Sequence, residues 1–193
     1  MSLVVLGLSG ALTHDPSAAI YVDGELIAAA EEERFTRQKH AKNAMPLHAA
    51  RYVLQEANLK AKDVDVVAFP FGKISLFGKA RWHYAKRHWY APDRALDAIF
   101  NGNRHYRRNV KKVRELLVEL GINWADIEFD AVEHHIAHAS SSYHLSGFEG
   151  KTAILGIDGK GEYATTFFGY GENGHIHKIK EFYDPDSLGQ LYA

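Results

Sequence analysis

The sequence of 193 residues contains no cysteine, only 5 prolines and almost no net charge. The absence of cysteine excludes disulfides and thiolate metal sites, so any metal ligands must be imidazoles or carboxylates. A formal net charge of −1 gives no general attraction to nucleic acids or membranes. No apolar run approaches the roughly 20 residues of a membrane span, and the N-terminal run is too short for a signal peptide. We expect a globular protein of the cytoplasm with no membrane partner.

The first third of the chain predicts three strands, a helix and a further strand. Residues 4–10 form an apolar run that ends in glycine. Residues 18–24 alternate and end in Asp-Gly, which is a hairpin signal, and residues 25–34 are the return strand. Residues 46–59 have helical spacing. Residues 64–71 predict a buried strand, as expected for an α/β layer.

A second series of strands repeats this order near the end of the chain. Residues 152–159 form a buried strand, residues 163–174 alternate and end in Asn-Gly, and residues 175–183 are the return strand. Repeated order of this kind predicts two related three-stranded units, in residues 1–71 and 152–193. We expect a helical insertion at about residues 75–121. The predicted fold class is α/β of the actin-like ATPase or sugar-kinase (ribonuclease H-like) type, in its N-terminal portion.

The segment EHHIAHASSSY at 133–143 places three histidines within five positions at the start of a predicted helix. His134 and His138 are four residues apart, so they lie on one helix face and can converge on one ion. His135 points about 100° away from them. The alternative is an ordinary polar helix start. With 12 histidines in the chain, two of them can fall four residues apart without forming a metal site.

Asp158 ends the buried strand AILGID and precedes Gly159 and Gly161. A carboxylate at the carboxyl end of a core strand is where α/β folds place ligand groups. A turn-forming Asp-Gly is the alternative. Beside two imidazoles, this carboxylate suits Fe²⁺, Mn²⁺ or Zn²⁺ with positions left for substrate.

Three further segments carry polar side chains. The loop at 10–19 can present backbone N–H groups to anions, but for this loop taken alone we favour a simple capped turn. The charged run at 31–40 is either a solvated face or a site for an acidic substrate. The basic and aromatic segment at 79–114 could bind RNA, but we favour helices with an aromatic inner face and a basic outer face. The polar residues of the first loop are Gly10, Thr13, His14, Asp15 and Ser17.

Taken in order, four segments resemble the ATP-dependent O-carbamoyltransferases of antibiotic tailoring and nodulation-factor modification. They are GLSGALTHDPSAAIYVDGELIAAAEEERFTRQKH, EHHIAHASSSYHLSGF, ILGIDGKGEYATT and SLGQLY. Residues 72–128 match little of the family. The resemblance implies an actin-like domain close to the threonylcarbamoyl-transfer protein of tRNA modification.

The resemblance also implies a reaction. ATP (with Mg²⁺) and carbamoyl phosphate form a carbamoyl-adenylate at a C-terminal domain, and the carbamoyl group passes to a hydroxyl of a small-molecule acceptor at the actin-like domain. Fe²⁺ or Zn²⁺ is held there by His134, His138 and Asp158, with a further aspartate expected beyond Ala193. The metal assists the transfer.

The remaining site residues follow from the same resemblance. His14 and Lys39 are expected to hold the carbamoyl or phosphate end and to act in catalysis. The expected contacts to substrate or nucleotide come from Gly10, Ser17, Gly159, Gly161, Glu162 and Thr165. His135 is expected to play a structural or supporting role.

Family members are about three times longer than this chain, so we expect a fragment that lacks the adenylate-forming domain and is inactive alone. Its expected partners are the acceptor and the remainder of its own polypeptide, and a homodimer is left open. The alternatives are a plain actin-like ATPase or sugar kinase, which needs no histidine pair, and an RNA-binding relative of the tRNA-modification proteins. We do not expect a nucleic-acid partner.

Overall fold

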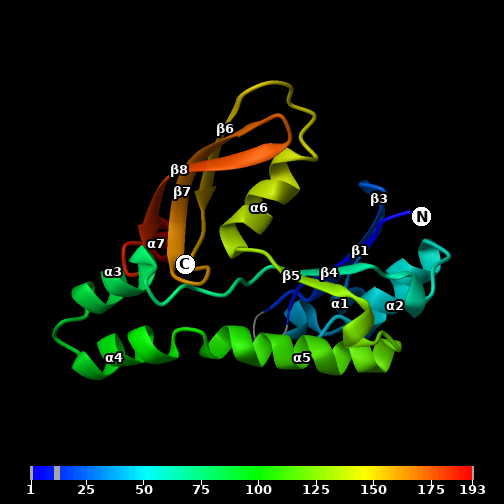
Figure 1. The fold of residues 1–193 in the computed structure, drawn as a ribbon, viewed down its shortest axis with the longest axis horizontal. Coiled ribbons are helices and arrows are strands. Elements are labelled where there is room, and N and C mark those ends of the chain that lie inside the picture. Colours follow the sequence, from blue (N-terminus) through cyan, green and yellow to red (C-terminus); the bar gives the residue numbers. More distant parts are fainter. Residues whose placement is uncertain (1, 11–13, 193) are drawn as a thin grey trace. The chain divides into compact units, whose positions relative to one another are not determined.

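The computed structural model describes residues 2–10 and 14–192, and these form two compact units (Figure 1). Unit 1 comprises Met1–Pro70 and His105–Ala131, and unit 2 comprises Phe71–Arg104 and Val132–Ala193. Thr13, one of the polar residues of the first loop, lies outside the described residues. Within the described part, no helix is both long and apolar enough to cross a membrane.

Unit 1 is built on a five-stranded mixed sheet in the order β3-β2-β1-β4-β5. Strand β1 pairs antiparallel with β2 and parallel with β4, while β2–β3 is antiparallel and β4–β5 parallel. This order and these directions are those of the ribonuclease H-like sheet, so the predicted fold class is confirmed. The strands are β1 (Val4–Leu8), β2 (Ser17–Val22), β3 (Glu25–Glu31), β4 (Val66–Phe69) and β5 (Glu128–Ala131).

The sequence pattern explains these elements. In β1, Val4, Leu6 and Leu8 alternate into the core with at most 4% of their surface exposed. Helix α2 (Leu47–Glu56) packs on β2 and β3 through a buried stripe that includes Val53 and Leu54. The other helices that contribute to unit 1 are α1 (Glu33–Thr36) and α5 (Arg104–Leu120).

Unit 2 contains the three-stranded antiparallel sheet β6-β7-β8. Helix α6 (His134–Tyr143) packs against all three strands (Figure 1). The strands are β6 (Thr152–Ile157), β7 (Ala164–Glu172) and β8 (His175–Tyr183), and the remaining helices are α3 (Lys79–Arg87), α4 (Pro92–Asn101) and α7 (Leu188–Tyr192).

Both predicted hairpin turns are confirmed. Asp23 and Gly24 have φ of 51° and 86°, and Asn173 and Gly174 have φ of 51° and 76°. Two consecutive residues with positive φ are what a two-residue type I′ hairpin requires, and Asn-Gly and Asp-Gly favour that conformation. These turns set the register of β2–β3 and β7–β8 beside each turn.

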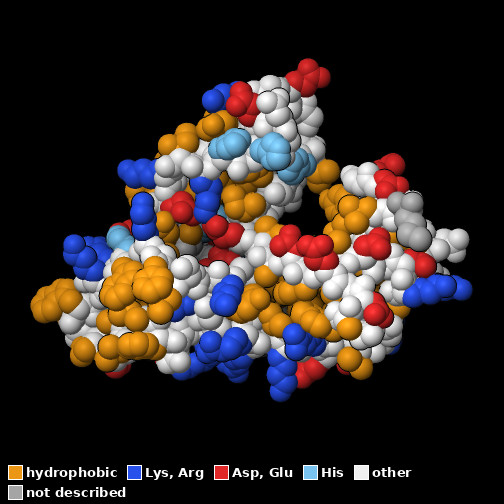
Figure 2. Space-filling model, in the orientation of Figure 1, with side chains coloured by type: hydrophobic (Ala, Val, Ile, Leu, Met, Phe, Trp, Pro, Cys, Tyr) orange, Lys and Arg blue, Asp and Glu red, His pale blue; other side chains and the backbone are white. Residues whose placement is uncertain are grey.

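The basic and aromatic segment is helical as predicted, but its expected aromatic inner face is wrong. Trp89 is 80% exposed and Phe100 is 72% exposed. Figure 2 shows hydrophobic side chains gathered on the surface of α3 and α4. The interior of this helix pair is instead organised by the buried Arg81, whose guanidinium donates to the carbonyls of Ile74 and Ile99. Two short helices enclose too little volume to bury several large rings.

Candidate functional site

The histidine segment forms α6, and a residue distant in sequence caps this helix. The N-cap residue Glu133 makes no side-chain cap bond. Instead, the Glu162 carboxylate accepts from the backbone N–H of His134 at 3.2 Å and from that of Gly72 at 2.6 Å. A carboxylate at a helix N-terminus satisfies otherwise unpaired donors and is favoured by the helix dipole. Glu162 therefore fixes the first turn of α6, which carries His134.

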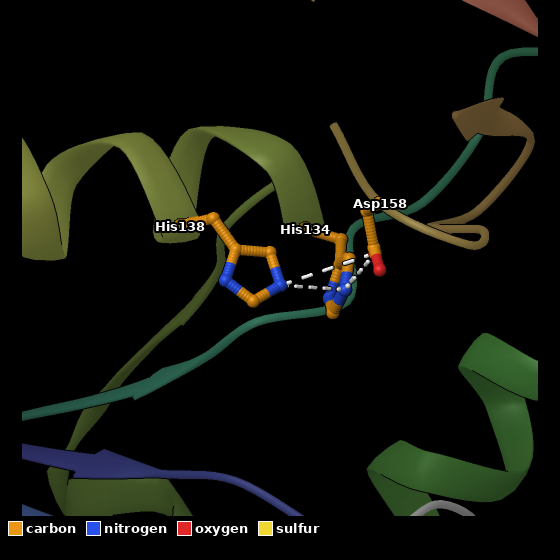
Figure 3. Close-up of side chains that lie close together, drawn as sticks. All are labelled: His134, His138 and Asp158. Carbon is orange, nitrogen blue, oxygen red and sulfur yellow. Dashed lines mark hydrogen bonds and ion pairs between the residues drawn. The ribbon is translucent and has the colours of Figure 1, made fainter. Parts of the chain in front are cut away.

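Three of the predicted ligands converge in unit 2 (Figure 3). His134 Nε2 lies 3.0 Å from Asp158 Oδ2 and 3.1 Å from His138 Nε2. His138 Nε2 lies 3.9 Å from the same Asp158 oxygen. The two histidines come from successive turns of α6, and Asp158 follows β6 directly. Three potential ligand atoms therefore face a common point.

Packing holds the His134 ring in this orientation. Phe71 stacks on it with ring centroids 4.6 Å apart and an interplanar angle of 26°. On another side, a Cβ at Gly161 would lie 3.1 Å from His134 Cβ, which is closer than ordinary packing. Glycine at 161 thus lets the loop after β6 approach α6. This contact gives Gly161 a physical role at the position where the sequence predicted a site residue.

The electrostatics keep Asp158 and His138 in the protonation states that metal ligands need. The hydrogen bond from His134, and then the nearby His135 imidazole, hold the pKa of Asp158 well below its ordinary value, and the backbone N–H of Gly159 acts in the same direction. Burial, together with the neighbouring His134, lowers the pKa of His138. At neutral pH the carboxylate is ionised and the His138 imidazole is neutral, and both can donate an electron pair.

The geometry fits a divalent cation. With Zn–N and Zn–O bonds near 2.0–2.1 Å, neighbouring ligands of a tetrahedral ion are about 3.3 Å apart. The observed separations of 3.0, 3.1 and 3.9 Å bracket that value. Two imidazoles and one carboxylate form the donor set of non-haem Fe²⁺ and of catalytic Zn²⁺ sites. Three protein ligands leave coordination positions for a substrate.

His135 lies closer to this cluster than its helix position suggests. Its side chain is 1% exposed, and its Nε2 is 3.6 Å from Asp158 Oδ2. A cavity of ≈ 320 Å³ lies between α6 and β6 and is lined by His135, His138, Ser142, Ile154 and Asp158 among others. A small ligand in this cavity would contact the side of the cluster.

The other predicted residues of unit 2 have contacts within the fold. Thr165 is fully buried, and its hydroxyl donates to the Asp186 carbonyl at 2.7 Å. Its own carbonyl accepts from the Asp158 N–H at 2.9 Å. Gly159 N–H donates to Asp158 Oδ1 at 2.6 Å. Thr165 and Gly159 therefore shape the loop that presents Asp158.

The predicted residues of unit 1 form a separate group. His14 Nδ1 lies 2.5 Å from Asp15 Oδ2, and His14 is largely exposed. Lys39 is exposed in a short 3-10 helix, Lys39–Ala41. Ser17 begins β2, and its carbonyl accepts from Ser9 N–H.

Gly10 has φ of 116°, and a Cβ there would meet Pro16 Cβ at 2.5 Å, so a glycine is needed at this turn. The residue that sequence reasoning missed in this group is His40, whose Nδ1 lies 2.9 Å from Asp15 Oδ1. His40 directly follows Lys39 in the charged run at 31–40, and of these two residues the sequence predicts only Lys39 as a site residue.

Comparison with known proteins identifies relatives along the whole chain. The chain is 34% identical over 196 residues to the uncharacterized protein sll1178 of Synechocystis sp., and the match covers 98% of this chain and 31% of the relative. It is 32% identical over 208 residues to Nodulation protein NolNO of Sinorhizobium fredii, covering 98% of this chain and 28% of the relative. The chain thus spans about a third of the length of these curated relatives.

Among solved structures, YeaZ from Pseudomonas aeruginosa aligns with a TM-score of 0.48 and 18% identity, covering 93% of this chain and 66% of YeaZ. The sequence model of one family, described as carbamoyltransferase N-terminus, matches residues 4–193. That match includes both three-stranded units, α6 and Asp158. The chain therefore belongs to the carbamoyltransferase N-terminus family.

Proposed function

We propose that this chain is the acceptor-side part of an ATP-dependent O-carbamoyltransferase in which His134, His138 and Asp158 hold Fe²⁺ or Zn²⁺. The observation that carries the proposal is the convergence of two imidazole nitrogens and a carboxylate oxygen within 4.8 Å of one another, in a member of a carbamoyltransferase family. A kinase or ATPase on this fold would use carboxylates and Mg²⁺, and would leave the two converging imidazoles without a role.

The proposed reaction moves a carbamoyl group from carbamoyl-adenylate, made from carbamoyl phosphate and ATP, to a hydroxyl of a small molecule. The hydroxyl oxygen bonds to the carbamoyl carbon and loses its proton to water, while the carbon–oxygen bond to the adenylate phosphate breaks and AMP leaves with the electron pair. A bound Fe²⁺ or Zn²⁺ supplies Lewis acidity that stabilises negative charge on the carbamoyl oxygen.

The chain's own residues prepare the site for that ion and its ligand. Before an ion binds, the His134 ring and the Gly159 N–H donate to Asp158 and keep it ionised, and the His134 proton is released when the ion takes its place. His138 stays neutral because burial disfavours its charge. Glu162 fixes the His134 backbone through a hydrogen bond, and Phe71 fixes the His134 ring by stacking on it. Preorganised ligands bind an ion without reorganisation, which favours both affinity and rate.

The test measures metal by elemental analysis in the purified chain and in a His134→Ala, His138→Ala double variant. We expect near-stoichiometric Fe or Zn in the parent and its loss in the variant. The matched control is His144→Ala, His175→Ala, which removes two exposed histidines of the same unit and should retain the metal. Equal metal in both double variants would contradict the assignment of the ligands.

Activity is then measured in the complete polypeptide with carbamoyl phosphate, ATP and hydroxyl acceptors. We expect carbamoylated product and AMP in equal amounts, and their loss in the His134→Ala, His138→Ala variant. Product formation that survives removal of the metal and of both histidines would exclude the metal-assisted transfer.

A further inference from the structure

A second group of potential metal ligands lies entirely within unit 1. It consists of Asp15 in the loop before β2, Glu33 at the start of α1 and His40 in the short 3-10 helix after α1. One donor atom from each of these residues lies within 4.8 Å of the donor atoms of the other two. Three segments of unit 1 therefore bring two carboxylates and one imidazole to a common point.

Backbone hydrogen bonds hold these segments together. Asp15 N–H donates to the His40 carbonyl at 2.9 Å, and the Glu33 carboxylate accepts from His40 N–H at 2.9 Å. Asp15 and His40 have φ of 52° and 62°, in a region that Asp and His tolerate better than most side chains. The fold thus places the three ligands before an ion arrives, which limits the reorganisation that binding requires.

The two oxygens of Asp15 have separate contacts. Oδ2 lies 2.5 Å from His14 Nδ1, and Oδ1 lies 2.9 Å from His40 Nδ1. Neighbouring ligand atoms of an octahedral ion with bonds of about 2.1 Å are about 3.0 Å apart, so an ion can replace the proton between Oδ1 and His40. The contact of His14 with Oδ2 then orients the carboxylate from its other side, as hydrogen bonds commonly do for metal ligands.

The charge of the group also suits a divalent cation. Arg34 lies 3.8 Å from Glu33 but 3.1 Å from Glu31, so it neutralises Glu33 only in part. Two carboxylates this close repel each other, and a cation between them turns that repulsion into attraction. Asp15 and His40 are half exposed, which leaves room for water in the remaining coordination positions. Carboxylates and water suit Mn²⁺, whereas the two imidazoles of the unit 2 cluster suit iron or zinc.

We propose that Asp15, Glu33 and His40 form a second divalent-cation site, of the Mn²⁺ type, that joins the loop before β2 to α1 and to the 3-10 helix after it. An ion that binds the folded chain and not the unfolded one stabilises the fold, so its role here is to hold these segments of unit 1 together. The site lies in unit 1 alone, and it does not depend on the proposed carbamoyl transfer.

The first experiment locates the ion without any substitution in unit 1. Mn²⁺ is paramagnetic and broadens the NMR signals of nearby nuclei, so it is added in small steps to the ¹⁵N-labelled parent chain. We expect the amide signals of Asp15, Glu33 and His40 to be among the first to disappear. They should disappear equally early in the His134→Ala, His138→Ala variant, which lacks the imidazoles of the unit 2 cluster. Broadening that spares these three amides in both chains would overturn the site.

The second experiment measures Mn²⁺ affinity from the EPR signal of the free ion, in the same double variant. Asp15→Asn and Glu33→Gln each remove one charged ligand, so we expect affinity to fall by about 100-fold or more. Asparagine tolerates the positive φ at position 15 as well as aspartate does. The controls are Asp23→Asn, at a φ of 51°, and Glu25→Gln, both at exposed positions of unit 1, and they should bind normally. Equal affinities in the ligand variants and the controls would refute the assignment of these ligands.

Discussion

Each of the two units places an aspartate in the loop between its first and second strands, at a different point of that loop. In unit 1 the aspartate is Asp15, between β1 and β2, and in unit 2 it is Asp158, between β6 and β7. Each carboxylate lies within hydrogen-bonding distance of an imidazole, and each has a second imidazole close by. The residue types and the connecting loop are therefore alike, although Asp15 lies just before β2 and Asp158 lies directly after β6.

What differs is the ring nitrogen that faces the carboxylate. In unit 1 the Nδ1 atoms of His14 and His40 take separate oxygens of Asp15, and the ring centroids are 6.4 Å apart. In unit 2 the Nε2 atoms of His134 and His138 face each other and one oxygen, with centroids 4.5 Å apart. In unit 2 the convergence of two nitrogens suits a metal, whereas in unit 1 each imidazole has its own carboxylate oxygen.

The largest effect is expected from Asp158→Asn, which tests the unit 2 side of this comparison. The substitution removes the charged ligand and leaves two imidazoles, so affinity for Zn²⁺ should fall by more than about 100-fold. Calorimetric titration of the purified parent chain and of the variant with Zn²⁺ measures this affinity. Asp93→Asn, at an exposed position in the first turn of α4, is the control of equal charge and should bind normally. Equal Zn²⁺ affinities of the parent and of Asp158→Asn would show that Asp158 is not a ligand.

A buried carboxylate in unit 1 provides the next largest effect, this time on stability alone. Glu32 is 3% exposed and accepts from Ala49 N–H at 2.9 Å and from His48 Nδ1 at 2.6 Å. Glu32→Ala leaves these donors at the start of α2 unpaired, so unfolding in urea should become easier by about 2 kcal/mol.

Metal bound by His134, His138 and Asp158 should stay unchanged in Glu32→Ala, because Glu32 lies in unit 1 and these three residues lie in unit 2. Glu25→Ala, at an exposed position in β3, is the control and should change stability little. A loss of metal in folded Glu32→Ala would mean that the two units do not behave separately.

Glu162→Gln should have a smaller effect on the unit 2 cluster. The amide keeps one acceptor oxygen but loses the charge and turns an NH₂ group toward the backbone donors of Gly72 and His134. We expect metal affinity to fall about tenfold, as for other changes that disturb a ligand's orientation. The same Zn²⁺ titration measures it, with Glu149→Gln in an exposed loop as the control. A full loss of binding would instead indicate that Glu162 is itself a ligand.

The smallest effect is expected at Tyr183, at the end of β8. Burial and the neighbouring Glu181 raise the pKa of Tyr183 to about 12. The unfolded chain loses this proton near pH 10 and the folded chain holds it, so the contribution of Tyr183 to stability is complete below pH 10 and is lost as the pH rises toward 12.

Tyrosinate absorbance of the parent minus that of Tyr183→Phe measures this titration. A difference signal that is complete by about pH 10 would contradict it.

Local patterns predicted much of the fold. Alternation in β2 and β7, the Asp-Gly and Asn-Gly turns and the helical spacing of α2 all concern residues close in sequence, where side-chain period and backbone preference act directly. The same is true of His134 and His138, because four residues on a helix make one turn. Burial of the aromatic residues in α3 and α4 was predicted wrongly, since burial depends on what surrounds a helix.

The sequence by itself determined which side chains are available: no thiols, an imidazole pair on one helix turn, and an aspartate after each first strand. Only the tertiary structure decided how they are used. It placed Asp158 beside His134, which is 24 residues earlier in the sequence, and His40 beside Asp15, which is 25 residues earlier. It also decided which ring nitrogen meets each carboxylate, because ring orientation follows from packing such as Phe71 on His134. Contacts between distant segments depend on how strands and helices pack, and no local pattern encodes them.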